Sequence, residues 1–195
     1  MTPVNPKKRI VVGISGASGA IYGIRALQVL RTADDIESHL VVSQAAARTI
    51  AEETDYSLAD VKALADVVHD NRDIGASIAS GSFLVAGMLV APCSIKSLSG
   101  IVHSFADTLL VRAADVCLKE RRPLVLMVRE TPFHAGHLDL CAKATSYGAI
   151  VMPPVPSFYH RPQTIDDIVN QTVGRALDLL GLHTAAVSRW TGVKG

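Results

Sequence analysis

A glycine-rich stretch near the start of the chain has the residue types to bind an anion. Gly13, Gly16 and Gly19 are spaced G-x-x-G-x-x-G, between the apolar run 10–12 and a segment, 22–30, with apolar residues at helical spacing. A turn from a strand into a helix points backbone N–H groups and the helix N-terminus at one place, which suits phosphate. The spacing is not the G-x-G-x-x-G of dinucleotide-binding proteins, so it does not choose among phosphate-bearing ligands. The alternative is a tight turn of an α/β domain that binds nothing.

A second group of donors follows the apolar run 87–91. Residues Ser94, Ile95, Lys96 and Ser97 open a predicted helix and offer hydroxyl and backbone N–H groups. Such a helix start suits a phosphate or the polar edge of a flavin. The alternative is an ordinary N-cap at Ser94 without a ligand.

Charged residues come directly after the predicted strand 123–128. Arginine, here Arg129, is the natural partner for a phosphate or a flavin carbonyl. Glu130 could donate a proton if its surroundings are dry enough to raise its pKa. Because both follow a buried strand, we expect them at the ligand-binding edge of the sheet.

Three charged residues share one face of a predicted helix over 108–120. Arg112, Asp115 and Lys119 stand at positions i, i+3 and i+7. The face could bind an anion, or it could be an ordinary salt-bridged surface.

Three further patterns indicate chemistry only weakly. His134-x-x-His137 has the spacing of a zinc-binding pair, but no third ligand is evident, so no metal site is expected. Ser15 resembles the nucleophile of a G-x-S-x-G elbow, but Ala17 stands at the last position and no acid or histidine partner is evident. Cys93, at a strand end, could be a nucleophile or a buried small residue.

The whole chain fits one α/β domain over residues 1–195, with a flexible N-terminus (1–7) and a C-terminal tail (181–195). It is 49% hydrophobic and only 5% aromatic, which predicts an aliphatic core. The net charge of +1 argues against nucleic-acid binding, which needs a clustered basic excess.

The sequence favours the cytoplasm. No run reaches the ~18 apolar residues of a membrane span, so no membrane association is expected. No signal peptide is visible at the N-terminus. The three cysteines form neither a disulfide framework nor a paired metal motif, which suits a reducing compartment.

Predicted strands alternate with predicted helices along the chain. The strands are expected at 10–12, 39–42, 87–91, 123–128 and 149–151, and the helices at 22–30, 44–53, 57–65, 95–104, 108–120, 132–147 and 164–180. Segment 67–82 is polar and irregular, either a mobile lid or a long connection. Strands that are apolar throughout indicate a parallel sheet covered on both faces, with ligands beyond its carboxyl edge.

Four segments together resemble the UbiX/Pad1-type flavin prenyltransferases, a family of flavoproteins. They are GISGASGAIYG, APCSIKSLSGI, RAADVCLKERRPLVLMVRETP and PSFYHRP, and the similarity extends over roughly residues 9–190. The resemblance implies a Rossmann-like, flavodoxin-like doubly wound sheet in a single domain. It also implies a homo-oligomer, commonly a dodecamer, in which a neighbouring subunit completes the site.

The resemblance implies a metal-independent reaction with two substrates, FMN and dimethylallyl phosphate. The dimethylallyl group is joined to N5 and then C6 of reduced FMN, closing a fourth ring. The product, prenylated FMN, would serve a UbiD-type decarboxylase.

The resemblance also assigns roles to residues. Those implied to bind FMN are Gly16, Ala17, Ser18, Ser43, Ser94, Ile95, Lys96, Ser97 and Arg129. Those implied to be catalytic are Ser18, Glu53, Lys119 and Glu130. Those implied to surround the prenyl phosphate are Arg112, Lys119, Tyr159 and Arg175.

Small departures from the family pattern leave these roles in place. Ile14-Ser15 stands where Met-Thr is common, Ser157 where Ala or Gly is usual, and the segment HAGHLDLCAKATSYG is less typical. One alternative is a flavin-dependent cysteine decarboxylase of the same fold, which carries a PASANT-like motif and a histidine in the helix after the loop. This chain has APCSIKSLSG and no histidine in that helix. The other alternative is a non-catalytic FMN carrier or decarboxylase accessory subunit.

Overall fold

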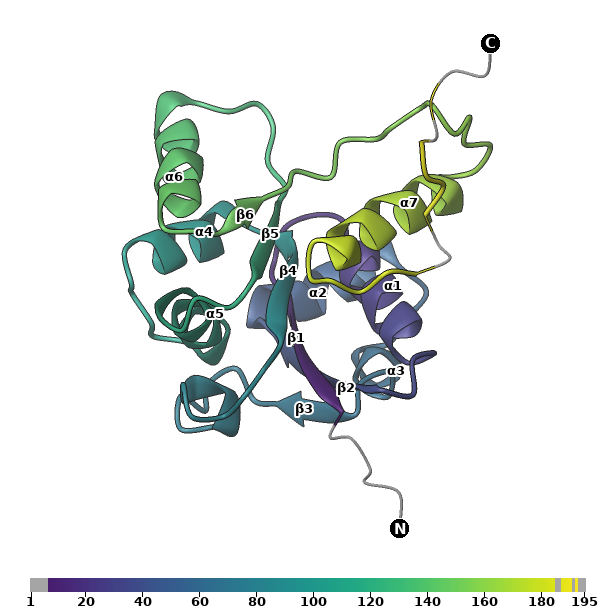
Figure 1. Ribbon diagram of the computed structural model, residues 1–195. Coiled ribbons are helices and arrows are strands. Elements are labelled where there is room, and N and C mark those ends of the chain that lie inside the picture. Colours follow the sequence, from purple (N-terminus) through teal and green to yellow (C-terminus); the bar gives the residue numbers. More distant parts are fainter. Residues whose placement is uncertain (1–6, 185–186, 191, 193–195) are drawn as a thin grey trace.

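The computed structural model describes residues 7–184, 187–190 and 192, and these form one parallel sheet with helices on both faces (Figure 1). The strands are β1 (Lys8–Ile14), β2 (Ile36–Val42), β3 (Val67–His69), β4 (Gly87–Cys93), β5 (Leu124–Val128) and β6 (Ile150–Val151). The helices are α1 (Ala20–Leu30), α2 (Gln44–Glu53), α3 (Leu58–Lys62), α4 (Ile95–Val102), α5 (Leu109–Lys119), α6 (Ala135–Ser146) and α7 (Ile165–Asp178), with a short 3-10 helix, η1, at Ser77–Ala79.

The strand order is β3-β2-β1-β4-β5-β6, and all pairs are parallel. Connections run outward from β1 in one direction and from β4 in the other, so the order reverses between these two strands. The predicted Rossmann-like, doubly wound fold is confirmed. In such sheets the ligand-binding crevice lies at this reversal, beyond the carboxyl ends of β1 and β4.

Two aliphatic layers enclose the sheet, as the low aromatic content predicts. One contains Ile10, Val12 and Ile14 of β1 with buried side chains of α1, α2, α3 and α7. The other contains Val11 of β1 with side chains of η1, α4, α5 and α6. Each fully buried Leu, Ile or Val side chain contributes about 1.5–3 kcal/mol relative to its exposed state, so the layers hold the sheet edge rigid beneath the loops.

Two predictions about elements are wrong. Segment 67–82 was expected to be irregular, but it contains β3, paired with β2 at His39↔Val67 and Val41↔His69, as well as η1. An edge strand of only three residues is too short to show a periodicity in the sequence. The helix expected from residue 132 begins at Ala135 instead, because the imidazole of His134 caps it by accepting from the N–H of Gly136 at 3.0 Å.

The chain ends are described only in part. The expectation of a flexible N-terminus concerns residues 1–7, of which 1–6 lie outside the described residues. Within the predicted tail, residues 187–190 are described and lie beside α7, whereas 185–186, 191 and 193–195 lie outside the described residues.

Candidate functional site

The ends of β1 and β4 are tied together by one buried hydroxyl. Ser15 Oγ donates to the carbonyl of Pro92 at 2.8 Å and accepts from the N–H of Ser94 at 2.7 Å. Its side chain is fully buried. Ser15 therefore holds the two loops of the crevice side by side, and a buried hydroxyl engaged in this way is not a nucleophile.

The glycine-rich loop lies tightly against the start of α2. A Cβ atom at Gly16 would stand 2.3 Å from Cβ of Ala45, so only glycine permits this approach. Gly19 is in the left-handed region (φ 97°), and its N–H donates to Oε2 of Glu53 at 2.7 Å. The structure thus brings Glu53, at the far end of α2, to the predicted binding loop.

Three helix N-termini converge at this edge of the sheet. The first is α1, which starts at the glycine-rich loop. The second is α2, capped by Ser43, whose hydroxyl accepts from the N–H of Ala46 at 3.1 Å. The third is α4, capped by Ser94, whose hydroxyl accepts from the N–H of Ser97 at 3.2 Å. Helix N-termini carry partial positive charge, so together they favour an anion.

A cavity of about 1500 Å³ opens beside these N-termini. Of the residues predicted to bind the flavin, it is lined by Gly16, Ser43, Ser94, Lys96 and Ser97. Its other lining residues include Arg48 of α2 and the segment 70–72 that follows β3. Ala17, Ser18 and Ile95 neighbour these lining residues in the chain but, like the predicted Arg129, do not line the cavity.

Arg129 and Glu130 lie at the same edge of the sheet, as predicted from their position after β5. The N–H of Arg129 donates to the carbonyl of Cys93 at 3.0 Å, next to the end of β4. Burial raises the pKa of the Tyr22 phenol on α1, and the nearby charge of Arg129 opposes this rise. The backbone of Arg129 is therefore fixed beside the end of β4. Oε1 of Glu130 accepts from the N–H of Thr131 at 3.0 Å.

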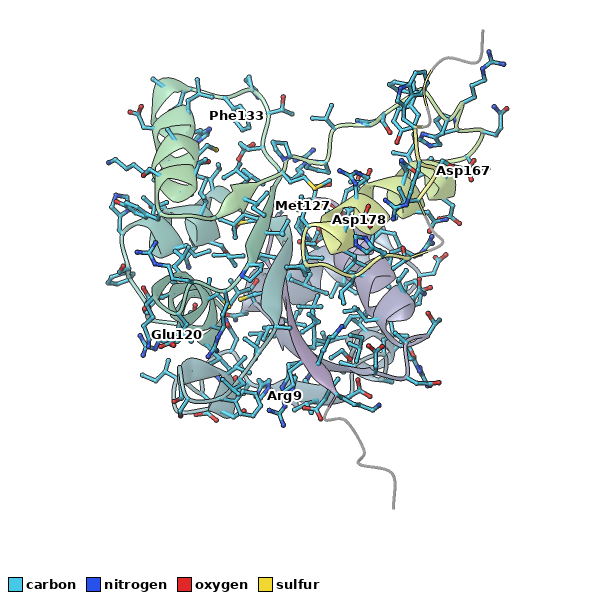
Figure 2. All side chains as sticks on the ribbon, in the orientation of Figure 1. Arg9, Glu120, Met127, Phe133, Asp167 and Asp178 are labelled. Carbon is cyan, nitrogen blue, oxygen red and sulfur yellow. The ribbon has the colours of Figure 1, made fainter. Side chains whose placement is uncertain are left out.

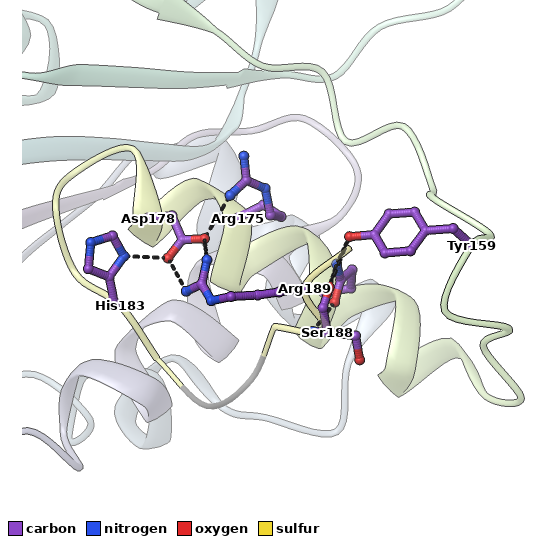
Figure 3. A network of polar contacts seen from close by, with 7 residues as sticks. Tyr159, Arg175, Asp178, His183, Ser188 and Arg189 are labelled. Carbon is purple, nitrogen blue, oxygen red and sulfur yellow. Dashed lines mark hydrogen bonds and ion pairs between the residues drawn. The ribbon is translucent and has the colours of Figure 1, made fainter. Parts of the chain in front are cut away.

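Tyr159 and Arg175 line a second cavity, of about 630 Å³. Its remaining walls are Val187, Ser188, Arg189 and Trp190, from the described part of the C-terminal tail. Figure 3 shows Ser188 and Arg189 together with Tyr159 and Arg175. One wall carries two guanidinium groups and a phenol, whereas Val187 and Trp190 are apolar. The combination suits a phosphorylated molecule with a short apolar group.

Asp178, at the end of α7, binds two arginines and a histidine beside this cavity. It accepts from Arg175 at 2.7 Å, from Arg189 at 2.9 Å and from His183 at 2.9 Å (Figure 3). Burial would raise the pKa of the Asp178 carboxyl, but hydrogen bonds from Arg189, His183 and Arg175 outweigh it and lower the pKa to about 2. The carboxylate is therefore charged at neutral pH and orients both arginines.

The structure does not bring Lys119 or Arg112 to Tyr159 and Arg175 within one chain. Lys119 ends α5 and pairs with Glu120 at 2.5 Å, near the start of β5 and on the opposite side of the sheet from α7. In Figure 2, Glu120 lies well below Met127 of β5. Arg112 donates to Asp115 at 2.9 Å and to the carbonyl of Ala79 at 3.2 Å.

The weaker sequence patterns gain no support as chemical sites. Among residues 7–184, 187–190 and 192, no group of three or more His, Cys, Asp or Glu side chains could hold a metal ion. The rings of His134 and His137 are in contact, with 3.6 Å between centroids and a tilt of 36° between their planes. Cys93 is fully buried, and burial raises the pKa of its thiol to about 12, so it packs as a small residue. No helix in the described ranges is long and apolar enough to cross a bilayer.

Sequence reasoning missed the polar residues behind the second cavity. Gln171, Asp178 and Arg189 belong to no motif, and their contacts depend on the tail returning to α7. Gln171 stands between Asn170 and Thr172 in the predicted helix, so no isolated polar position marked it.

Comparison with known proteins places these features in a family. The family model described as Flavoprotein matches residues 3–177. The flavin prenyltransferase UbiX of Escherichia coli K12 is 65% identical over 187 residues, covering 95% of this chain and 99% of the relative.

Two solved structures superpose closely. AnUbiX (PadA1), in complex with FMN and dimethylallyl pyrophosphate, has a TM-score of 0.94 and 48% identity over 96% of this chain and 100% of the other. A dodecameric FMN-dependent UbiX-like decarboxylase from Escherichia coli O157:H7 has a TM-score of 0.92 and 48% identity over 94% and 100%.

Proposed function

We propose a role for each site residue, starting from the premise that this chain belongs to the UbiX-type flavin prenyltransferases, within the flavoprotein family. The protein is an enzyme that transfers a prenyl group to FMN. Its prenyl donor, the roles of its residues and its recipient protein are the proposals.

We place FMN at the edge where β1 and β4 separate. The donors there fit this group: three helix N-termini and serine hydroxyls for a phosphate, Arg129 for a flavin carbonyl, and a cavity of about 1500 Å³. The residues that would hold it are Gly16, Ala17, Ser18, Ser43, Ser94, Ile95, Lys96, Ser97 and Arg129. Reduced FMN supplies the electron-rich ring that accepts the prenyl group.

We place the phosphate of dimethylallyl phosphate in the cavity of Tyr159 and Arg175. Transfer without a metal requires fixed donors that stabilise the charge developing on the departing phosphate. Arg175 can provide a charge-assisted hydrogen bond and Tyr159 a neutral one. Lys119 and Arg112, which lie elsewhere in the chain, would reach this cavity from a neighbouring subunit.

Three further side chains have proposed roles in proton handling and orientation. Glu130 would move the proton that the reaction releases or that the phosphate takes up, since it follows β5 at the carboxyl edge. Glu53 is oriented by the N–H of Gly19 at 2.7 Å and would hold its charge beside the loop. Ser18 would donate from that loop. Holding both substrates together could contribute up to ~7–11 kcal/mol to lowering the barrier.

The proposal extends to the protein's surroundings. The enzyme would work as a homo-oligomer, with a dodecamer as the expected assembly, and would deliver prenylated FMN to a UbiD-type decarboxylase. Cys93, Cys117 and Cys141 are free thiols, which suits the reducing cytoplasm that we propose as its location.

The observation that carries this proposal is 65% identity to a flavin prenyltransferase over 95% of the chain. The test is to incubate the protein anaerobically with reduced FMN and dimethylallyl phosphate and to measure the mass of the flavin. We expect the gain of one prenyl unit, and its loss in Glu130→Gln. An unchanged flavin mass would refute prenyl transfer. Release of CO2 from a peptide with a C-terminal cysteine would then indicate the decarboxylase alternative, and stable FMN binding alone would indicate a carrier.

A further inference from the structure

Gln171 is a buried polar side chain that the reaction as described does not use. It lies on α7, and only 4% of its surface is exposed. Its Nε2 donates to Oη of Tyr159 at 2.6 Å and to the carbonyl of Ser188 at 3.1 Å. Its Oε1 accepts from the N–H of Ser188 at 2.8 Å. Both polar atoms of the carboxamide thus bind Tyr159 or Ser188, and both of these residues line the second cavity.

The contact with Ser188 resembles the pairing of neighbouring strands. Gln171 binds both the N–H and the C=O of one tail residue, which fixes the backbone in position and in orientation. Tyr159 closes the triangle by donating its hydroxyl proton to the carbonyl of Ser188 at 3.0 Å. Because the phenol oxygen accepts from Gln171, the phenol proton is left free to point outward from α7, to Ser188 or to a phosphate oxygen.

A second anchor lies two helical turns further along α7. Asp178, whose side chain is 5% exposed, binds the guanidinium group of Arg189 through both carboxylate oxygens, at 2.9 and 3.1 Å. The two anchors hold consecutive tail residues, Ser188 and Arg189 (Figure 3). The next residue, Trp190, packs edge-on against Tyr159 with 5.9 Å between ring centroids. Together with the Tyr159 contacts, these anchors fix the described tail beside Arg175.

We infer that Gln171 is a positioning residue for prenyl transfer. Acting through Tyr159 and Ser188, it holds the 187–190 segment against α7 and thereby forms the wall of the prenyl-phosphate pocket. The inference rests on the proposed function, in which this cavity takes the phosphate of the donor. Under this inference, a change at Gln171 weakens the binding of the prenyl donor. It leaves the binding of FMN unchanged, because the proposed FMN site lies at the β1–β4 edge.

Trp190 gives a direct readout of the tail, because it is the single tryptophan of the chain. In flavin-free Gln171→Leu, we expect easier quenching of its fluorescence by acrylamide and lower anisotropy. The matched control is Thr172→Val. Thr172 is the next residue, equally buried, and its hydroxyl donates only within α7, to Ile168 at 2.7 Å. The control should keep the wild-type fluorescence.

Kinetics provide the second readout. In Gln171→Leu we expect the KM for dimethylallyl phosphate to rise about tenfold or more, which corresponds to losing hydrogen bonds to a positioned group. The Kd for FMN should stay within about twofold of the wild type. If Gln171→Leu does not fold, Gln171→Glu replaces it, since this variant keeps the size of the side chain and loses both N–H donors.

The outcomes separate this inference from the function on which it rests. Wild-type quenching together with a wild-type KM in the Gln171 variants would overturn the inference and leave prenyl transfer intact. A parallel loss of FMN affinity would also overturn it, because that loss indicates a general structural role. If wild-type protein does not prenylate FMN, the proposed function fails, and the Trp190 measurement still decides whether Gln171 holds the tail.

Discussion

At Gly16 the backbone of the loop approaches α2 more closely than any side chain would permit. The nearest atom to a Cβ at this position is Cβ of Ala45 at 2.3 Å, followed by Ala45 backbone atoms at 3.2 and 3.3 Å. These atoms belong to the first turn of α2 and cannot move as the end of a flexible side chain could. The packing of the loop and the convergence of helix N-termini therefore depend on this one residue.

The variant Gly16→Ala should lose both stability and flavin affinity. We expect a destabilisation of about 1–3 kcal/mol from overpacking, and weaker FMN binding because the α1 and α2 N-termini are pushed apart. Chemical denaturation and a flavin titration measure the two effects. Gly75→Ala is the control, since its nearest contact would be an ordinary 3.4 Å. Equal behaviour of the two variants would contradict the proposed close approach.

The three thiols should differ in reactivity according to their burial. Burial raises the pKa of Cys93 and of Cys117 to about 12, so neither forms the reactive thiolate at neutral pH. Cys141 is partly exposed, and burial raises its pKa less. We expect a thiol reagent at pH 8 to label Cys141 in the native protein and the other two only after unfolding. Cys141→Ser should abolish the native labelling, and rapid labelling of Cys93 would revive the nucleophile hypothesis.

Among the elements, β3 is held to the sheet edge by a chain of hydrogen bonds between side chains. Nε2 of His69 and Nδ1 of His39 are 3.0 Å apart, and Nε2 of His39 lies 2.8 Å from Oε1 of Glu37. Arg9 of β1 also donates to Glu37, at 2.9 Å. Because a carboxylate only accepts, a neutral His39 donates from Nε2 to Glu37 and accepts at Nδ1 from the Nε2–H of His69. Protonating His69 leaves this hydrogen bond in place but puts a charge on a partly buried ring beside His39.

This arrangement predicts a loss of stability in mild acid. Burial lowers the pKa of His69 below its usual 6.5, the neighbouring His39 lowers it further, and Asp73 opposes them. Because the unfolded chain binds a proton near pH 6.5 and the native chain only at lower pH, stability should fall as the pH drops below about 6.5. Urea unfolding between pH 7.5 and 5.5 measures this slope. His69→Gln should flatten it and exposed His103→Gln should not, whereas an unchanged slope in His69→Gln would refute the assignment.

The features that could be predicted from the sequence are those that depend on residues close together in the chain. The apolar runs at β1, β2, β4 and β5 identified these strands because most of their residues are buried on both faces, and the short apolar run 149–151 identified the partly buried β6. The strand ends in turn placed Ser43, Ser94, Arg129 and Glu130 at one edge. In contrast, β3 depends on pairing with β2, and the anchoring by Gln171 depends on a tail that returns 17 residues later. Such contacts leave no local pattern, so only the folded chain shows them.

At the scale of the whole molecule, the residues implied to surround the prenyl phosphate fall into two separate groups. Tyr159 and Arg175 line the cavity beside α7, on the face of the sheet covered by α1, α2 and α3. Arg112 and Lys119 belong to α5, on the other face, and Lys119 lies where β5 begins rather than at its carboxyl edge. One chain cannot bring the two groups to a single phosphate without unfolding its core. If both groups serve the reaction, a second subunit must supply α5.

Mixed oligomers test this division of the site between subunits. Lys119→Ala and Arg175→Ala should each abolish most prenyl transfer, because each removes a cation from every site. When the two variants are co-expressed with different tags and purified together, roughly a quarter of the sites would combine an intact Arg175 with an intact Lys119 from the neighbour. We therefore expect about that fraction of wild-type activity to return, while Lys119→Ala assembled with itself stays inactive. Mixed oligomers that assemble, bind FMN and remain inactive would show that Lys119 does not act across a subunit boundary.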